Sequence, residues 1–311
     1  MIKHKEENLK VSISCLVYNH EPYLRECFDG FMMQKTNFDF EVLVHDDAST
    51  DNSASIIREY ETKHPDIFKP IYQTENQYSK GVKVSATFNF PRAKGKYIAM
   101  CEGDDYWTDP LKLQKQVDFL ESHPDYVMCS HHFVTYDQET KEYGKDWNSH
   151  INEDLSFDLN YFIQPTTWIT QPLTLLYRRN CLDLNKYSLY KNSKDVTLIY
   201  HLLTSGKGMF LKENMGIYRI HGGGVWASVN INSQNKSEFK ARIGIYMIEN
   251  DDISAQYIRN QFTKNISRLW MLSERALMVK IFKILSKHFG LLSTIKLYSQ
   301  KILFNKILKP I

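Results

Sequence analysis

The chain has 311 residues, of which 42% are hydrophobic and 24% charged, and it carries a net charge of +3. This composition is typical of a globular protein and excludes disordered and fibrous classes. The five cysteines are widely spaced without a CxxC pair, which predicts reduced thiols, and no export signal or membrane-spanning run is visible. We therefore expect a cytoplasmic protein.

One pattern occurs three times in the first 105 residues: a short apolar strand, a polar strand end and, after the first two strands, a helix. Apolar runs predict strands at 11–18, 41–44 and 97–101. Pro22 opens the first helix, and polar capping residues at 49–53 precede the second. Strands that alternate with helices indicate right-handed crossovers and a parallel sheet.

Polar residues follow each of these strands. Asn19 follows the first, Asp46 and Asp47 end the second, and Asp104 and Asp105 come shortly after the third. Ligands of open parallel sheets bind at the carboxyl ends of the strands, so these side chains should converge on one crevice. The chain has no GxGxxG and no GxxxxGKS/T sequence, so neither type of glycine loop supplies a phosphate site.

The segment after the third strand carries three carboxylates within four residues, Glu102, Asp104 and Asp105. Packed side by side, they would repel one another unless a cation lay among them. Carboxylate oxygens suit Mg²⁺ or Mn²⁺, and such an ion can hold phosphates where no glycine loop does. The cluster therefore predicts a divalent metal site.

Two later segments carry further candidates. Residues 195–203 predict a helix that begins at Asp195; this acid can be a helix cap or a general base, and the spacing alone favours the cap. Arg219 and His221 stand just before three glycines. A loop of this kind can fold over a ligand, with the imidazole on a metal and the guanidinium on a phosphate. An ordinary surface turn is the alternative.

The C-terminal region is strongly basic. From residue 255 onward it has eleven basic residues and one acid, which gives about +10 there and about −7 for the rest of the chain. Leu277, Ile281, Leu285 and Leu292 recur near every fourth residue, which predicts a basic amphipathic helix. Solvated lysines on a helical subdomain and docking on the anionic inner leaflet of the membrane are the two interpretations. Nucleic acid is disfavoured, because aliphatic rather than aromatic residues separate the charges.

Four segments together resemble family 2 glycosyltransferases of the GT-A fold: residues 17–20, 45–51, 93–98 and 102–105. The resemblance implies an α/β fold with a Rossmann-like, mostly parallel central sheet flanked by helices, followed by a helical C-terminal extension. It also implies three segments, which are a nucleotide-sugar-binding half at 1–105, an acceptor-binding half of the same domain at 106–230, and the basic helical extension at 231–311.

The resemblance further implies roles for individual residues. The nucleotide would be bound by Val17, Tyr18, Asn19, Asp46, Asp47 and Asp104. Tyr18 would lie against the base, Asp46 or Asp47 would contact the base, and Asp104 would lie near the ribose.

For the metal and the chemistry, the resemblance implies that Asp105 and His221 hold Mg²⁺ or Mn²⁺ against the diphosphate, and that Asp195 is the catalytic base. Donor or phosphate contacts would come from Glu102, Arg219 and Trp107. Glu102 stands where many members have Asp and retains the charge.

The expected reaction is a metal-dependent, inverting transfer of a sugar from a nucleoside-diphosphate donor, preferably a UDP-sugar, to a hydroxyl of a glycan or lipid-linked acceptor. The protein would act in the cytoplasm, with peripheral contact on the inner face of the membrane if the tail docks there. Two alternatives remain: a non-catalytic nucleotide-sugar-binding scaffold, and a two-carboxylate glycosidase that needs no metal.

Overall fold

The computed structural model describes residues 8–165, 168–224, 231–271 and 275–307. The chain forms two compact units. The first unit contains residues 1–158, 168–185 and 201–221, and the second contains residues 159–167, 186–200 and 222–311. The predicted extension from residue 231 thus belongs to a larger unit that also contains three short pieces of the predicted acceptor half, residues 159–167, 186–200 and 222–230.

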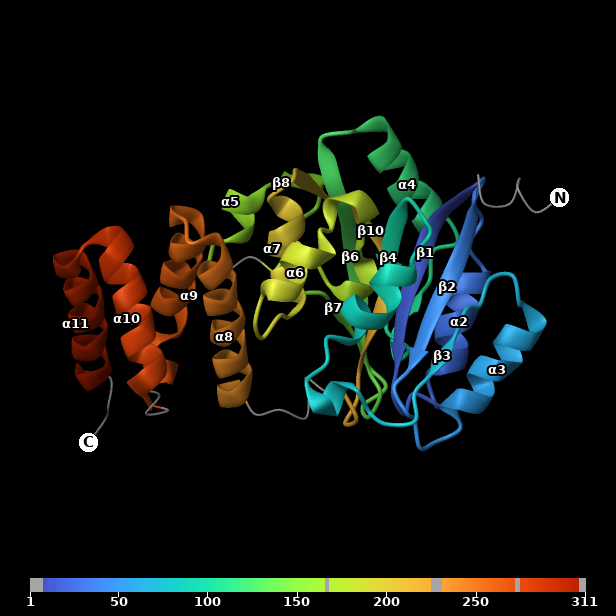
Figure 1. The fold of residues 1–311 in the computed structure, drawn as a ribbon, viewed down its shortest axis with the longest axis horizontal. Coiled ribbons are helices and arrows are strands. Elements are labelled where there is room, and N and C mark those ends of the chain that lie inside the picture. Colours follow the sequence, from blue (N-terminus) through green and yellow to red (C-terminus); the bar gives the residue numbers. More distant parts are fainter. Residues whose placement is uncertain (1–7, 166–167, 225–230, 272–274, 308–311) are drawn as a thin grey trace. The chain divides into compact units, whose positions relative to one another are not determined.

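All strands of the described residues belong to one mixed sheet in the first unit (Figure 1). They are β1 (Leu9–Val17), β2 (Asp39–Asp46), β3 (Ile71–Tyr72), β4 (Tyr97–Met100), β5 (Tyr106–Trp107), β6 (Tyr126–Asp137), β7 (Tyr143–Lys145), β8 (Leu155–Phe157), β9 (Leu176–Arg178) and β10 (Lys207–Ile220). Their order is β3-β2-β1-β4-β9-β6-β10-β5, with β7 on β6 and β8 on β10.

The three strands predicted from the apolar runs are β1, β2 and β4, and they are parallel neighbours. Ile13 of β1 lies opposite Val42 of β2 and Ala99 of β4. In β1 the residues Ile13 and Cys15 alternate with Ser14 and are fully buried on the side of the core, as the period of two requires. The carboxyl ends of these strands therefore lie side by side, and the predicted α/β arrangement is confirmed.

The remaining pairings make the sheet mixed. β9 is antiparallel to both β4 and β6, β5 and β8 are antiparallel to β10, and β7 is antiparallel to β6. The longest contact is the parallel pair of β6 and β10, whose register shifts between Leu211 and Asn214 and again between Asn214 and Ile217. These bulges let β10 change course before it reaches the end of the sheet where β4 finishes.

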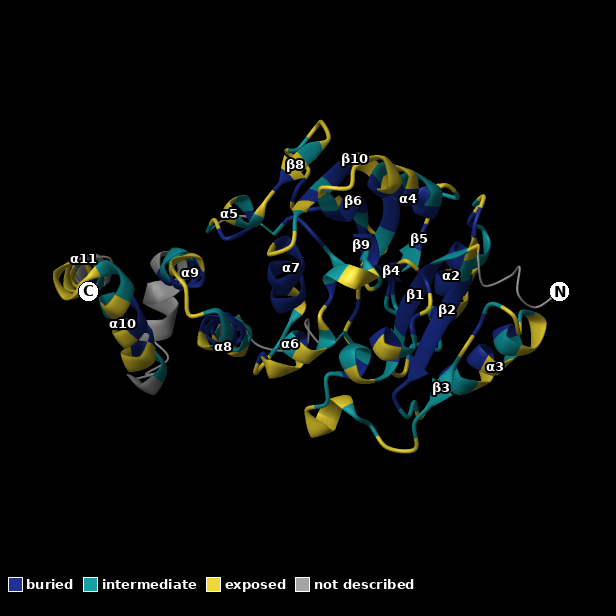
Figure 2. Ribbon diagram, turned by 45° about the horizontal axis from the view of Figure 1, so that its top comes forward, coloured by how far each residue is buried: buried dark blue, intermediate teal, exposed yellow. Residues whose placement is uncertain are grey.

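Helices α2 (Leu24–Met32), α3 (Ser53–Lys63) and α4 (Lys112–Ser122) cover the sheet of the first unit. Each buries one apolar stripe: Phe28 and Phe31 from α2, Ile57 from α3, and Leu113 and Val117 from α4 are in the core. Figure 2 shows the buried strands β1 and β2 and the exposed outer face of α3. These helices follow the amphipathic pattern expected of helices on a sheet.

One charged residue departs from that pattern. Lys112, at the start of α4, is fully buried, and its Nζ lies 3.8 Å from the ring centre of Trp107. Nζ has no hydrogen-bond partner among the described residues. Burial lowers the pKa of Lys112 from 10.5 to about 7, because a low dielectric disfavours the charged amine.

The boundary between the two units crosses α6 (Leu184–Leu189) and α7 (Asp195–Leu203). The second unit also contains α5 (Leu159–Phe162), α8 (Ile231–Glu249), α9 (Asp252–Met271), α10 (Arg275–Phe289) and α11 (Leu291–Ile307). The helices α8 to α11 pack in sequence, each against the next (Figure 1). Their apolar core includes Phe239, Ile258, Phe262, Ile281 and Leu285.

The predicted amphipathic helix of the tail is α10, with one correction. Ile281 and Leu285 are buried as expected, but Gly290, at a φ of 79°, ends α10 before Leu292 is reached. Leu292 lies in α11 instead and is 84% exposed. None of the helices in the described ranges combines the length and apolar character that a membrane crossing requires.

Candidate active site

The loops that follow β1 and β2 are joined by hydrogen bonds. Asn19 has a left-handed backbone with a φ of 56°. Its side-chain oxygen accepts from the backbone N–H of Thr50 at 2.7 Å, and its own N–H donates to Ser49 Oγ at 3.0 Å. The N–H of Glu21 donates to Asp51 Oδ2 at 3.0 Å. The two strand ends are therefore one rigid edge, which we call the paired edge, formed by residues 17–21 and 46–53.

Asp46 and Asp47 are both buried in the paired edge but differ in what they hold. Asp47 accepts the backbone N–H of Gln77 at 2.8 Å with one oxygen and that of Tyr78 at 3.0 Å with the other. Asp46 Oδ1 accepts the N–H of Ser49 at 3.1 Å, and its Oδ2 has no hydrogen-bond partner among the described residues. Asp46 is thus the acid with an oxygen left for a ligand.

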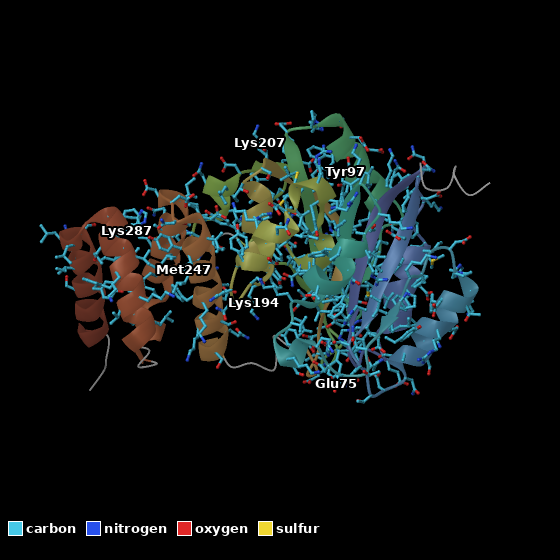
Figure 3. The ribbon with its side chains drawn as sticks, in the orientation of Figure 1. Glu75, Tyr97, Lys194, Lys207, Met247 and Lys287 are labelled. Carbon is cyan, nitrogen blue, oxygen red and sulfur yellow. The ribbon has the colours of Figure 1, made fainter. Side chains whose placement is uncertain are left out.

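Val17 and Tyr18 form the start of the same edge. The carbonyl of Val17 accepts the N–H of Asp47 at 2.9 Å, which fixes the spacing of the two loops. Tyr18 is 43% exposed, so its ring is open to a stacking partner. Glu75, labelled in Figure 3, lies just before the segment that Asp47 holds.

Asp104 and Asp105 lie at the end of β4, and we call them the acid pair. Asp104 Oδ2 is 3.2 Å from His221 Nε2 and 3.7 Å from His20 Nε2. Burial alone would raise the pKa of Asp104, but the hydrogen bond to His221 and the neighbouring His20 outweigh it, and the pKa is lowered. Burial also lowers the pKa of His20, so this imidazole is neutral near pH 7.

Asp105 has the opposite balance. It is buried, and Oδ1 accepts a hydrogen bond from the backbone N–H of Arg219 at 2.8 Å. Burial and the adjacent charge of Asp104 raise the pKa of Asp105 well above its usual value, more than that hydrogen bond lowers it. A nearby cation would reverse this balance, because opposite charge favours the ionised carboxylate.

Arg219 connects the acid pair to α2. Its Nε donates to the carbonyl of Asp104 at 2.7 Å, and its guanidinium pairs with Glu26. The guanidinium carbon also lies 5.1 Å from the ring centre of Tyr23 and 4.6 Å from that of Tyr106. The sequence predicted that Arg219 contacts a phosphate. For that contact to form, the ion pair between Arg219 and Glu26 would have to break. The sequence offered no sign of the Glu26 contact, which spans 193 positions.

Gly103 sets how closely the acid pair approaches β1. A Cβ at this position would lie 2.9 Å from His20 Nδ1 and 3.0 Å from Val17 Cγ2, distances that side chains do not tolerate. The missing side chain therefore lets His20 reach Asp104. The sequence singled out the acids around Gly103 but not this histidine as their neighbour.

The donor atoms at this edge fit a divalent cation that is shared with a substrate. In the described residues no group of three or more His, Cys, Asp or Glu side chains forms a ready metal site. Mg²⁺ in phosphate enzymes normally takes one or two carboxylates and completes its shell with phosphate and water. Asp105, beside the ionised Asp104, can supply a carboxylate of that kind, and the imidazole of His221, 3.2 Å from Asp104 Oδ2, can supply a nitrogen donor. His20 Nδ1 is a buried atom without a partner among the described residues.

Of the other predicted donor contacts, Trp107 lies in the core, whereas the charge of Glu102 acts on Asp105 and helps to raise its pKa. Trp107 is 1% exposed, and its Nε1 donates to the carbonyl of Leu173 at 2.8 Å. Its ring packs against Phe31 in the core, so the sequence expectation of a donor contact is corrected: Trp107 supports the acid pair from behind. Glu102 accepts a hydrogen bond from Cys27 Sγ at 3.5 Å through its carbonyl.

Asp195, the predicted base, belongs to the second unit and is the first residue of α7. Lys194, labelled in Figure 3, precedes the helix, and its carbonyl accepts the N–H of Thr197 at 2.8 Å. The Asp195 carboxylate makes no hydrogen bond to any described residue, so it does not cap the helix. Asp195 is exposed, but the groups packed around its carboxylate partly desolvate it and raise its pKa; Lys194 opposes the rise and Glu238 adds to it.

The chain belongs to glycosyl transferase family 2, whose model matches residues 12–184, more than half of the sequence. An uncharacterised protein of Mycobacterium tuberculosis is 36% identical over 226 residues, which cover 70% of this chain and 61% of that protein. The match thus spans only about three fifths of the length of that relative. An uncharacterised glycosyltransferase of Nostoc sp. is 33% identical over 250 residues, covering 77% of this chain and 73% of the relative.

Solved structures confirm the fold. S. aureus TarS in complex with UDP-GlcNAc superposes with a TM-score of 0.63 at 17% identity, covering 90% of this chain and 80% of that chain. A mannosyltransferase from Pyrobaculum calidifontis in complex with GDP-Man and Mn²⁺ gives a TM-score of 0.57 at 15% identity, with 94% and 80% covered. The chain therefore has a GT-A fold, as the sequence resemblance implied.

Proposed function

We propose that this protein transfers a sugar from a nucleoside-diphosphate donor, UDP-linked in preference, to a hydroxyl of a glycan or lipid-linked acceptor, with Mg²⁺ or Mn²⁺ as cofactor. The observation that carries the proposal is the acid pair. Asp105 is buried beside an ionised Asp104 and resists ionisation in the absence of a cation. The raised pKa of a buried acid next to a second carboxylate suits a site that binds a metal–diphosphate complex.

In this proposal the paired edge binds the nucleoside. The exposed ring of Tyr18 stacks on the base, and Asp46 accepts from it through the oxygen that is not bonded to Ser49. Asp47 fixes the segment of Gln77 instead of touching the ligand. Asn19 and Val17 hold the backbone of the edge, and Asp104 lies where the ribose would reach the acid pair.

In the reaction, Asp105 and His221 would hold the cation, which supplies positive charge against the diphosphate leaving group. Asp195 takes the proton of the acceptor hydroxyl as that oxygen attacks the anomeric carbon, and the bond to the diphosphate breaks in one inverting displacement. The raised pKa and unbonded carboxylate of Asp195 support this role, because a base works best when its pKa lies near the operating pH.

A transfer assay with defined variants tests the proposal. The wild type should be stabilised against heat by a UDP-sugar with Mn²⁺ more than by GDP- or CDP-sugars, and chelation by EDTA should remove both this shift and the activity. Asp195→Asn should abolish transfer while retaining donor binding. Glu153→Gln, which changes an exposed acid paired with Lys212, is the matched control and should behave as wild type.

The same assay separates the alternatives. A glycosidase would stay active in EDTA, because paired carboxylates need no metal. A non-catalytic scaffold would bind the donor but give no product in any variant. Undiminished transfer by Asp195→Asn would overturn the assignment of the base while leaving donor binding intact.

We also propose that α10 and α11 contact an anionic membrane surface. Leu291, Leu292 and Ile295 are exposed at the start of α11, and exposed lysines accompany them on both helices, namely Lys280, Lys283, Lys287 and Lys296. Apolar side chains that enter the interface and lysines that attract anionic lipid act together, with roughly 1 kcal/mol for each lysine near the surface.

Vesicle sedimentation of the full chain tests this contact. Binding to vesicles with anionic phospholipid should exceed binding to phosphatidylcholine vesicles, and it should fall at high salt. Leu292→Ser should weaken the binding, whereas Met247→Ser, which changes an exposed apolar residue of α8 (Figure 3), should not. Equal binding to both kinds of vesicle, or none to either, would reject the contact.

A further inference from the structure

Three aromatic rings, from β6, β10 and the loop after β7, form a cluster. The ring centres of Phe133 and Trp147 are 5.0 Å apart, those of Trp147 and Tyr218 are 5.8 Å apart, and those of Phe133 and Tyr218 are 6.0 Å apart. Within the cluster, Phe133 is buried, whereas Trp147 is 46% exposed. We call these residues the aromatic triad. An exposed tryptophan on a buried base is a surface that a ligand can cover.

The loop that carries Trp147 is held rigidly. On one side, Asp146 Oδ2 is 2.7 Å from His132 Nδ1, and its Oδ1 accepts the N–H of Asn148 at 2.9 Å. On the other side, Asn148 Nδ2 donates to the carbonyl of Trp168 at 2.9 Å. Asp146 and Asn148 are both buried. The backbone is therefore anchored before and after Trp147, and the ring is preorganised for binding at little further cost in entropy.

The triad reaches the acid pair through β10. Tyr218 directly precedes Arg219, whose N–H donates to Asp105. The antiparallel pairing of β5 with β10 sets Tyr106 opposite Ile217. Tyr106 directly follows Asp105, and Ile217 directly precedes Tyr218. Phe133 lies in β6 and Tyr218 in β10, on the side of β4 that is away from β1 and β2 in the sheet order. The triad thus lies one residue along β10 from the backbone N–H that holds Asp105, and it does not use the paired edge.

We infer that the aromatic triad is a subsite for a sugar ring of the acceptor, with Trp147 as the stacking residue. This inference rests on the proposed glycosyl transfer. A pyranose has an apolar face of C–H groups and a polar rim, which suits an open aromatic face bordered by the hydroxyl of Tyr218. The exposed part of the triad is only one to two rings wide, far less than the roughly 800 Å² that a protein partner needs. The nucleoside has its own aromatic residue, Tyr18.

Saturation-transfer NMR with the full chain tests the subsite. The probes are the disaccharides maltose, cellobiose, chitobiose and mannobiose, with UDP-GlcNAc and the diamagnetic ion Mg²⁺ present. At least one disaccharide should receive saturation at the C–H protons of one ring face. Trp147→Ala should weaken its binding about tenfold, in line with the ~1.4 kcal/mol of one aromatic contact. Trp147→Phe should restore most of it.

The controls separate this inference from the proposed function. Leu111→Ala, which trims an exposed apolar residue of the first unit, should bind the disaccharides as wild type does. Heat stabilisation by UDP-GlcNAc and Mn²⁺ should be the same in wild type and Trp147→Ala. Disaccharide binding that is absent in wild type, or unchanged in Trp147→Ala, overturns the subsite. If UDP-GlcNAc with the cation does not stabilise the wild type against heat, but the disaccharides still bind in a way that depends on Trp147, the proposed donor is wrong and the subsite stands.

Discussion

At the ends of β1 and β2 the polar side chains are paired with backbone amides, whereas after β4 the buried carboxyl group of Asp105 lies beside the partly exposed carboxylate of Asp104. The first arrangement costs little, because each acceptor meets a donor of fixed geometry. The second raises the pKa of Asp105, because burial and the neighbouring charge of Asp104 disfavour its ionised form. The difference indicates two kinds of site. The hydrogen bonds of the paired edge are already formed without a ligand, whereas the acid pair needs a bound cation to balance its charge.

The strongest test of this contrast is Asp105→Asn. Transfer should fall by about 10³-fold, because several kcal/mol of charge stabilisation depend on a metal held there. The free energy of unfolding should not fall, since the amide oxygen can still accept from Arg219 and a buried acid is removed. Turnover measurements and chemical denaturation check both halves. Asp118→Asn, on the exposed side of α4, is the control, and near-normal transfer by Asp105→Asn would contradict the metal assignment.

The opposite result is expected at the paired edge. Asp47→Ala removes the acceptor of Gln77 and Tyr78 and should lower the free energy of unfolding by about 3 kcal/mol, because two hydrogen bonds to a charged group are lost. Asp46→Ala should cost about 1 kcal/mol, since it removes one. In donor binding the ranking should reverse, with Asp46→Ala the weaker binder. A larger stability loss for Asp46→Ala would contradict the contrast between the two acids.

Lys112 tests whether a buried charge away from both edges also costs stability. Its pKa is lowered to about 7 in the folded protein and stays near 10.5 in the unfolded chain, so the unfolded chain binds the extra proton between these values. Stability therefore rises with pH across this window. The wild type gains this stability and Lys112→Met does not. From pH 7 to 8.5 the free energy of unfolding of the variant minus that of the wild type should therefore fall by about 2 kcal/mol. Denaturation at several pH values checks this, and a constant difference would place the amine in water.

The smallest expected effect concerns strain in the paired edge. Ala48 has a φ of 64°, which L residues with a Cβ avoid. Ala48→Gly should raise the free energy of unfolding by about 0.5 kcal/mol, the relief of strain exceeding the added entropy of the unfolded chain. Ala54→Gly, inside α3, should lower it. If both variants lose stability equally, the loop at Ala48 is not strained.

Much of the first unit could be predicted from local patterns. The alternating residues of β1, the apolar run of β2 and the acids after β4 predict three parallel strands with a shared polar end, and the structure has them. The two- and three-residue strands β5, β7 and β9 could not be found, because such short segments show no periodicity. Leu292 was assigned to the wrong helix, since the break at Gly290 depends on a left-handed backbone conformation.

Site residues could be predicted where they directly follow a strand, and could not be predicted where their role depends on contacts between residues far apart in the sequence. Asp104 and Asp105 are conspicuous in the sequence. The approach of His20 to Asp104 depends on a missing side chain at Gly103, and the pairing of Glu26 with Arg219 depends on how α2 meets β10. Trp147 was missed because nothing in its own segment marks it, and only the folded loop sets its ring against Phe133 and Tyr218.

The two register shifts of β10 that follow Leu211 determine which side chain faces which neighbour at the end of the strand. Because side chains of a strand alternate between the two faces of the sheet, an odd change in length between Asn214 and Ile217 would exchange the positions of Tyr218 and Arg219. The guanidinium would leave Glu26 and the phenol would take its place. Insertions or deletions in this short segment would therefore change the contacts of Tyr218 and Arg219 together.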